Sequence, residues 1–190
     1  MKIRIHEIFE ESRANGPSLR FVVFMQGCHF KCEGCINPQT HDPDGGYSLT
    51  VAELINKIKS IRDKLEGVTI TGGEPFLQPN ALYELTSEIK GLGLSIIIST
   101  GYELDELECE IENFNQIITN CDVLICGRFH HDEYLGMGLL GSTNKRIVLI
   151  TQKYQLEDIY NTPKLEIQIS NNEIKASGTG LYDFFNWNQF

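Results

Sequence analysis

Short apolar segments alternate with segments of helical periodicity along most of the chain, and this alternation constrains the fold more than any other feature. The apolar segments have the length of buried strands, and the segments between them repeat apolar residues on one helical face. Such an order implies right-handed βαβ units and a mainly parallel sheet with flanking helices. We expect strands at residues 19–25, 68–71, 94–99, 123–126 and 147–150 and helices at residues 50–65, 80–90 and 103–112.

Local signals refine these boundaries. Thr50 and Glu53 have the spacing of a capping box, which predicts that a helix begins there, and Gly67 is expected to end it. Near the C-terminus, two short runs flank Asn171-Asn172, which predicts a hairpin within an extension of about residues 164–190. We expect residues 1–190 to form a single α/β domain, open or partly closed into a barrel.

The charge balance limits the classes of partner. The 190 residues include 16 Lys and Arg against 26 Asp and Glu, a formal net charge of −10. So acidic a chain is a poor nucleic-acid binder, because such proteins need cations to replace the counterions of phosphates. The N-terminal segment lacks the apolar core of a signal peptide, and no stretch has the apolar length of a membrane span. We expect a cytoplasmic protein with reduced cysteines and no membrane partner.

Three of the six cysteines lie within eight residues. Cys28, Cys32 and Cys35 have the spacing C-x3-C-x2-C, so three thiolates can reach one metal centre. A cubic [4Fe–4S] cluster has four irons, and three cysteines leave one iron without a protein thiolate. An open coordination position is typical of a catalytic metal site rather than a structural one.

Spacing alone leaves other interpretations of these cysteines open. A structural zinc site needs a fourth ligand, for which His29 and His41 are the candidates. Unligated thiols are a third interpretation, whereas a disulfide framework fits poorly with a cytosolic chain of this size.

Three unusual loops follow three neighbouring predicted strands. The cysteine loop comes after the first strand, Thr71-Gly-Gly-Glu-Pro75 after the second, and Ser99-Thr-Gly-Tyr102 after the third. Because ligands gather at the carboxyl ends of parallel strands, we expect these loops to meet at one edge of the sheet. The sequence therefore predicts an active site there.

The cysteine motif together with Gly72-Gly-Glu-Pro75 resembles the radical S-adenosylmethionine (SAM) superfamily. The resemblance implies a partial (β/α) barrel, a [4Fe–4S] cluster on the three cysteines, and SAM chelating the fourth iron through its amino and carboxylate groups. It also implies reductive cleavage of SAM to methionine and a 5′-deoxyadenosyl radical. Glycines let a backbone approach a ligand closely, and the Glu74 carboxylate can accept a hydrogen bond from a cationic amine. By itself, the glycine pair would be interpreted as a plain strand-to-helix turn.

Further segments are similar to those of glycyl-radical-enzyme activating proteins. Within that group, the Glu-Gly between Cys32 and Cys35 and the late segment Leu140 to Arg146 are most similar to the activating protein of the anaerobic ribonucleotide reductase. The resemblance covers roughly residues 13 to 150. The segments that carry it are Asn15-Gly-Pro-Ser-Leu-Arg20, Gln26-Gly-Cys28, Cys35-Ile-Asn-Pro-Gln-Thr-His41 and Ser99-Thr-Gly-Tyr-Glu-Leu104.

The chain departs from the family pattern at a few positions. Many radical SAM proteins have an aromatic residue before the third cysteine, where this chain has Gly34, so the backbone of Gly34 and Ile36 is expected to contact adenine. The usual Gly-Pro-Gly is Gly16-Pro-Ser18, and the expected Asn-Gln of the late motif is Asn144-Lys145.

Several other residues have both a functional and a structural interpretation. Ser99 and Thr100 are placed to approach the SAM carboxylate or ribose, or they are satisfied strand-end hydroxyls. Arg128 and Arg146 either help to place a substrate loop or the SAM carboxylate, or they are solvated surface arginines. His130-His-Asp-Glu133 is expected to be a solvated loop rather than a metal site. We expect Cys109, Cys121 and Cys126 to be buried free thiols.

Together these features favour a radical SAM activase that abstracts hydrogen from a glycine Cα of a partner enzyme, with anaerobic ribonucleotide reductase as the expected partner. Flavodoxin or ferredoxin would supply the electron. Two rival hypotheses remain, a radical SAM enzyme acting on a small molecule such as a deazapurine precursor or on a peptide, and a non-catalytic iron–sulfur electron carrier.

Overall fold

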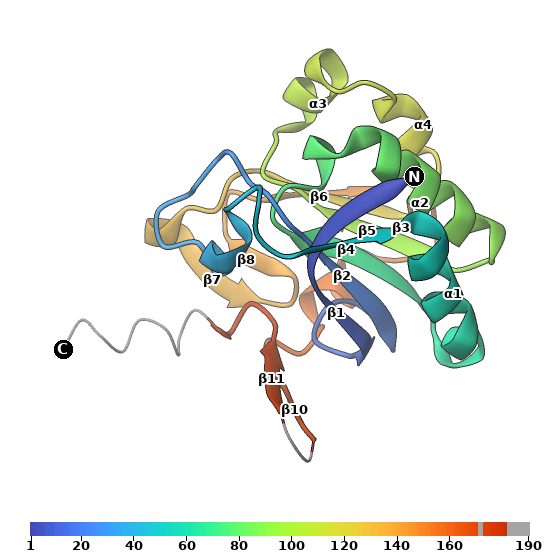
Figure 1. Cartoon of the computed structure of the whole chain (residues 1–190). Coiled ribbons are helices and arrows are strands. Elements are labelled where there is room, and N and C mark those ends of the chain that lie inside the picture. Colours follow the sequence, from blue (N-terminus) through green and yellow to red (C-terminus); the bar gives the residue numbers. More distant parts are fainter. Residues whose placement is uncertain (171–172, 182–190) are drawn as a thin grey trace.

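A seven-stranded mixed sheet forms the centre of the molecule, with the strand order β3-β1-β2-β4-β5-β6-β9 (Figure 1). The structure is a computed structural model that describes residues 1–170 and 173–181. Strands β2, β4, β5 and β6 run parallel, whereas β1, β3 and β9 are antiparallel to their neighbours. The strands are β1 (Lys2–Ser12), β2 (Arg20–Met25), β3 (Tyr47–Thr50), β4 (Gly67–Gly72), β5 (Ser95–Ser99), β6 (Val123–Cys126) and β9 (Arg146–Leu149).

The predicted parallel sheet is confirmed for its centre, and the strands at its edges, whose direction was not predicted, are antiparallel. Strands joined through a helix or a long crossover become parallel neighbours, as β2, β4, β5 and β6 do. The short connection from β1 to β2 makes those two strands antiparallel neighbours instead. The strand order leaves β3 and β9 as edges, and closure into a partial barrel stays a prediction.

Helices cover one face of this sheet. Leu54 and Ile58 of α1, Leu85 of α2 and Ile117 of α4 are fully buried against strand residues such as Ile96. The capping box at Thr50 is confirmed. The Thr50 hydroxyl accepts a hydrogen bond from the Glu53 amide, and the Glu53 carboxylate accepts one from the Thr50 amide. The helices are α1 (Val51–Ile61), α2 (Pro79–Gly91), α3 (Leu104–Glu110), α4 (Phe114–Ile118) and α5 (Leu156–Tyr160).

Gly67 does not end helix α1, contrary to the prediction. The helix ends at Ile61, a short 3-10 helix follows at Arg62–Lys64, and Gly67 is the first residue of β4. A Cβ at Gly67 would lie 2.0 Å from the Ser95 hydroxyl of the neighbouring strand. The glycine is therefore required by close strand packing rather than by a helix end.

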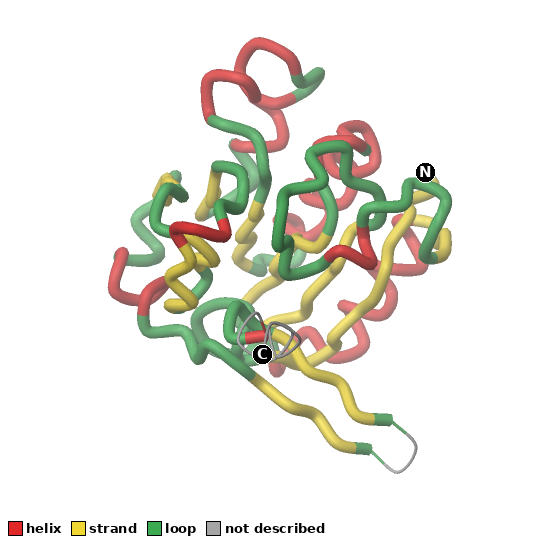
Figure 2. The backbone as a smooth tube through the Cα atoms, turned by 90° about the vertical axis from the view of Figure 1, so that its left-hand side faces the viewer, coloured by secondary structure: helices red, strands yellow, loops and turns green. Residues whose placement is uncertain are grey.

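The opposite face of the sheet is covered by the late part of the chain. Alternate residues of the central strands point to this face, among them Phe24, Thr69, Ile97 and Ile125. Figures 1 and 2 show that the covering elements lie away from α1 and α2. They are β7 (Tyr134–Met137), β8 (Leu140–Ser142), α5 and the hairpin of β10 (Glu166–Ile169) and β11 (Ile174–Ser177).

The predicted C-terminal hairpin is confirmed as an antiparallel pair, and its Asn171-Asn172 turn lies outside the described residues. The hairpin packs against the N-terminal strand, where Lys175 pairs with Glu7 at 2.6 Å. The Arg13 amide donates a hydrogen bond of 2.6 Å to the Glu166 carboxylate. In the described ranges, every helix is too short or too polar to cross a membrane.

Candidate functional site

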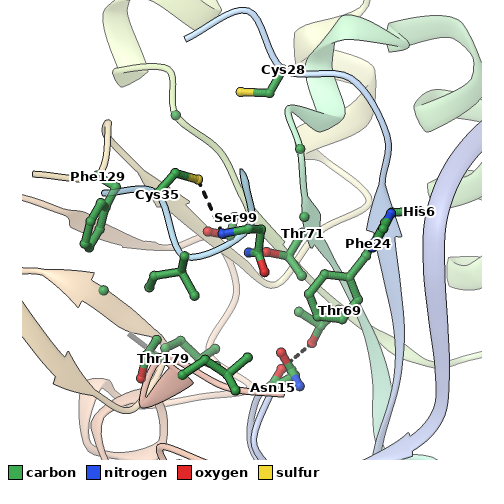
Figure 3. A pocket seen from close by; sticks show the side chains of 18 of the residues that line it. His6, Asn15, Phe24, Cys28, Cys35, Thr69, Thr71, Ser99, Phe129 and Thr179 are labelled. Atoms are coloured by element: carbon green, nitrogen blue, oxygen red, sulfur yellow. Dashed lines mark hydrogen bonds between the residues drawn. The ribbon is translucent and has the colours of Figure 1, made fainter. Parts of the chain in front are cut away.

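The three loops that the sequence analysis singled out line one cavity at the carboxyl ends of β2, β4 and β5. Cys35, Thr71 and Ser99 point into this cavity from three separate segments (Figure 3). Gly34 is the one predicted site residue that is not part of its lining. The predicted residues that do line it are Cys28, Cys32, Cys35, Ile36, Gly72, Gly73, Glu74, Ser99 and Thr100.

Backbone hydrogen bonds close the base of the cysteine loop. The Gly27 amide donates to the Thr40 carbonyl at 2.8 Å, and the Cys28 amide donates to the His41 carbonyl at 3.1 Å. The buried Gln26 side chain donates to the Asp42 carbonyl at 2.7 Å. These bonds hold both ends of residues 27–42 together, so the cysteines lie on a closed loop rather than on a free strand end.

The cysteine thiols have the chemistry expected of metal ligands. All three are free and half-buried, and they line the same cavity. Burial raises the pKa of Cys35 to about 11 and also raises the pKa of Cys28. Metal binding must therefore displace their protons, as is usual for thiolate ligands.

The thiols do not form a preformed site for a single ion. Within residues 1–170 and 173–181, no group of three or more Cys, His, Asp or Glu side chains is arranged to hold one metal ion. In a cluster, each thiolate binds a different iron, so the sulfurs need not converge on one point. Three thiols around one shared cavity thus fit a cluster, with His29 and His41 outside any zinc-like group.

Gly72 and Gly73 are required by backbone packing. The Gly73 amide donates to the Met25 carbonyl and the Glu74 amide to the Gly27 carbonyl, both at 2.8 Å. Gly72 has φ +94°, and a Cβ on Gly73 would lie 2.4 Å from the Gly27 carbonyl oxygen. The glycine pair therefore fixes the second loop directly to the segment that leads into the cysteines.

Glu74 ties the second loop to the third. Its fully buried carboxylate accepts hydrogen bonds from the Thr100 hydroxyl at 2.8 Å, the Gly101 amide at 2.8 Å and the Phe76 amide at 3.0 Å. Burial raises the pKa of Glu74 to about 7, although these hydrogen bonds act in the opposite direction. The carboxylate was expected to accept a hydrogen bond from a ligand amine, whereas in the structure its hydrogen bonds come from its own chain.

Aromatic contacts connect the third loop back to the cysteine loop. Phe30, between the first two cysteines, packs edge-on against Tyr102 with ring centroids 4.9 Å apart. The Arg128 guanidinium lies 4.5 Å from the centre of the Phe30 ring and makes a two-point contact with the Glu106 carboxylate, at 2.8 and 3.1 Å. Arg128 is therefore a structural clamp on the cysteine loop, which neither of the interpretations from sequence included.

The lining of the cavity contains two polar residues, Thr71 and Lys145, that were not among the site residues predicted from the sequence. Thr71 of β4 and Ser99 of β5 both line the cavity, and their side chains lie close to each other in Figure 3. Strand alternation places Thr71 on the same face as Thr69, and this spacing was the available signal. Lys145 also lines the cavity, although from the sequence it stood out only as a departure from the late motif.

Other candidates behave as ordinary structural residues. The His130 ring lies 3.1 Å from the Glu133 carboxylate and the His131 ring 2.8 Å from the Asp132 carboxylate, so both rings contact carboxylates of their own segment. Asn144 donates to the Arg128 carbonyl at 2.9 Å, and Arg146 is exposed on β9.

The three remaining cysteines were expected to be buried, and two of them are. Cys121 and Cys126 are buried, and burial raises the pKa of each thiol, that of Cys126 to about 12. Cys109 is exposed, because it lies on the outer side of the short helix α3. That part of the prediction was wrong.

Comparison with known proteins is consistent with this geometry. The family model described as a 4Fe-4S single cluster domain matches residues 14–148, which include the cysteine loop and the loops after β4 and β5. The pyruvate formate-lyase-activating enzyme of Clostridium pasteurianum is 34% identical over 135 residues, 68% of this chain and 54% of that protein. The enzyme of the same name from Staphylococcus epidermidis is 29% identical over 161 residues, 80% of this chain and 63% of its own length.

These relatives extend beyond the match, since the chain spans between half and two thirds of their length. The family match, in contrast, covers most of this chain and the whole of the cavity edge formed by the loops after β2, β4 and β5. The chain belongs to the 4Fe-4S single cluster domain family.

Proposed function

We propose that this chain is a radical SAM activase, which generates a glycyl radical on a partner enzyme. The observation that carries the proposal is the convergence of three free thiols, the Gly72–Glu74 turn and the Ser99–Thr100 strand end on one cavity. The names of the relatives support it, because pyruvate formate-lyase-activating enzymes are activases by name.

Cys28, Cys32 and Cys35 would hold a [4Fe–4S] cluster at the mouth of this cavity. When bound, the cluster and SAM supply one-electron reductive cleavage of the SAM sulfonium. The chain's own residues position the reactants. The backbone at Gly72 and Gly73 presents carbonyls to the SAM amino group, and the Ser99 and Thr71 hydroxyls provide hydrogen bonds at the cavity floor.

Glu74 has a different role in this proposal from the one its motif suggests. Its carboxylate is occupied by Thr100, Gly101 and Phe76. It would orient the loop after β5 relative to the glycine turn, and so set the shape of the SAM site indirectly. Replacement of Glu74 should therefore weaken SAM binding together with the packing of that loop.

The proposed partner is a glycyl-radical enzyme, and two classes of such enzyme are candidates. Relatives named for pyruvate formate-lyase make a glycyl-radical enzyme of that type one candidate. The Glu33-Gly34 pair and the segment Leu140 to Arg146 favour the large chain of an anaerobic ribonucleotide reductase as the other. A low-potential flavodoxin or ferredoxin would donate the electron in the cytoplasm.

One experiment tests the cluster assignment. Protein reconstituted anaerobically with iron and sulfide should bind about four irons per chain. Alanine at Cys28, Cys32 or Cys35 should abolish this, whereas Cys109→Ala should not, because that thiol is exposed on α3 away from the cavity. Stoichiometric zinc and no cluster in protein purified without air would overturn the proposal.

A second experiment tests the substrate. Deuterium should move from a partner labelled at glycine Cα into 5′-deoxyadenosine when the reconstituted protein, SAM and a low-potential reductant are present. Both candidate partner classes should be tried, and each should receive the same labelled-glycine assay. If SAM is cleaved but deuterium is transferred from neither class of partner, the chain is not an activase, although it is still a radical SAM enzyme.

One observation favours a small-molecule or peptide substrate as the second candidate. Ala176, Gly178 and Thr179 from the C-terminal segment line the cavity, so the chain encloses more of it than its length suggested. Deuterium transfer from a small metabolite instead of from a partner protein would support this reading. An electron carrier without catalysis predicts no SAM cleavage at all.

A further inference from the structure

Lys145 is a charged residue of the cavity that the proposed function does not use. It lies between β8 and β9 and lines the same cavity as the three cysteines. Among the described lining residues, it is the only Lys or Arg. The chain has ten more acidic than basic residues, so a cation in the lining of this cavity stands out; Arg128 also acts on Cys32 electrostatically, but it does not line the cavity.

Among the described residues, the hydrogen-bond partner of the Lys145 ammonium group is uncharged. Its Nζ donates a short hydrogen bond to the Gly127 carbonyl oxygen, which is a neutral acceptor. Within the described residues, Lys145 makes no ion pair with a carboxylate, in contrast to Lys64, Lys153 and Lys175. A half-buried cation without a counter-charge is costly, so a negative group is expected to lie near it in the working protein.

The candidates for that negative group within the cavity are the cysteine thiols and the Glu74 carboxylate, which line it together with Lys145. Burial lowers the pKa of Lys145, whereas Cys32 and then Glu74 raise it. In return, Lys145 lowers the pKa of Cys35. The ammonium therefore lies within electrostatic reach of two of the three cluster cysteines.

The surrounding backbone holds Lys145 in this position. Gly127, whose carbonyl accepts the hydrogen bond, has φ +108°, a conformation that favours glycine. The neighbouring Asn144 side chain donates to the Arg128 carbonyl at 2.9 Å, which ties the β8–β9 turn to the segment after β6. Both the ammonium and its acceptor are thus fixed by the chain.

We propose that Lys145 compensates the negative charge of the cysteine-held cluster and so makes its one-electron reduction easier. This inference rests on the proposed function for the cluster itself. A nearby cation stabilises the more negative, reduced form more than the oxidised form, and net charge is one of the factors that set the reduction potential of such clusters. Lys145 contacts no reacting atom in this role, so it is a positioning charge rather than a catalytic residue.

The test is a redox titration of the reconstituted protein, followed by electron paramagnetic resonance, with one electron per cluster from a low-potential chemical reductant. Lys145→Met should shift the midpoint potential to more negative values, and Lys145→Arg should restore it towards that of the unchanged protein. Lys59→Met is the matched control, since it removes the same charge from an exposed position on α1. Circular dichroism of each metal-free variant establishes that it folds.

Each outcome bears on the inference. A potential that is the same in Lys145→Met and Lys59→Met overturns it and leaves the proposed function intact. Loss of the cluster in a folded Lys145→Met, with retention in Lys145→Arg, supports the need for a cation. Loss of the cluster in both Lys145→Met and Lys145→Arg, when both variants fold, shows that the shape of the lysine side chain matters rather than its charge. This result overturns the inference. An unchanged protein that takes up no cluster overturns the proposed function and the inference together.

Discussion

At the scale of single residues, Glu74 controls how the site responds to pH. Its folded-state pKa of about 7 lies above the ordinary value of 4.5, because burial penalises the carboxylate. A raised pKa adds stability that is fully present below about pH 4.5 and is lost as the pH rises through about 7. Relative to Glu74→Gln, the free energy of unfolding of the metal-free protein should fall by on the order of 2–3 kcal/mol between pH 5 and pH 8. Urea unfolding at both pH values measures this. Glu53→Gln is the control, since the pKa of Glu53 is lowered and its effect should appear only at lower pH. A difference between the unchanged protein and Glu74→Gln that does not vary with pH would contradict the assignment.

At the scale of elements, the clamp on the cysteine loop gives a second prediction. Arg128 stacks on Phe30 and pairs with Glu106 on α3, so it links the segment after β6 to the loop between Cys28 and Cys32. Arg128→Gln should speed amide hydrogen exchange within residues 28–36 in the metal-free protein, with a loss of stability of about 1 kcal/mol. Arg62→Gln, on the helix-covered side, loses its own hydrogen bonds to Leu92 and should leave that exchange unchanged. Equal exchange in both variants would show that the clamp does not hold the loop.

The same scale shows what the sequence could predict. The central strands were predictable because their apolar runs are buried on both faces, and β6 has the predicted bounds, Val123–Cys126. Strands β7 and β8 were not predictable, because they are short and contain glycines whose pairing depends on the rest of the chain. The convergence of the three loops followed from topology, whereas the roles of Phe30 and Lys145 depend on contacts between distant segments.

At the scale of the whole molecule, the segment after β1 and the segment after β11 meet at the cavity. The Asn15 side chain donates to the Ser12 hydroxyl at 2.9 Å and to the Ser177 hydroxyl at 2.6 Å, which joins the segment after β1 to the end of β11. The Thr179 hydroxyl donates to the Gly138 carbonyl at 3.0 Å, so the same C-terminal segment also contacts the β7–β8 hairpin. These contacts should make the C-terminal wall of the cavity, residues 176–179, unfold together with the segment after β1. The effects of Asn15→Ala and Ser177→Ala on the free energy of unfolding should then differ from additivity by about 0.5–1.5 kcal/mol in a double-mutant cycle measured by urea unfolding. Asn15→Ala and Thr179→Val share no hydrogen bond, so their effects should add to within about 0.5 kcal/mol. If the free-energy changes of Asn15→Ala and Ser177→Ala are also additive, the C-terminal wall folds independently of the segment after β1. The cavity could then open on that side without loss of stability in the rest of the sheet.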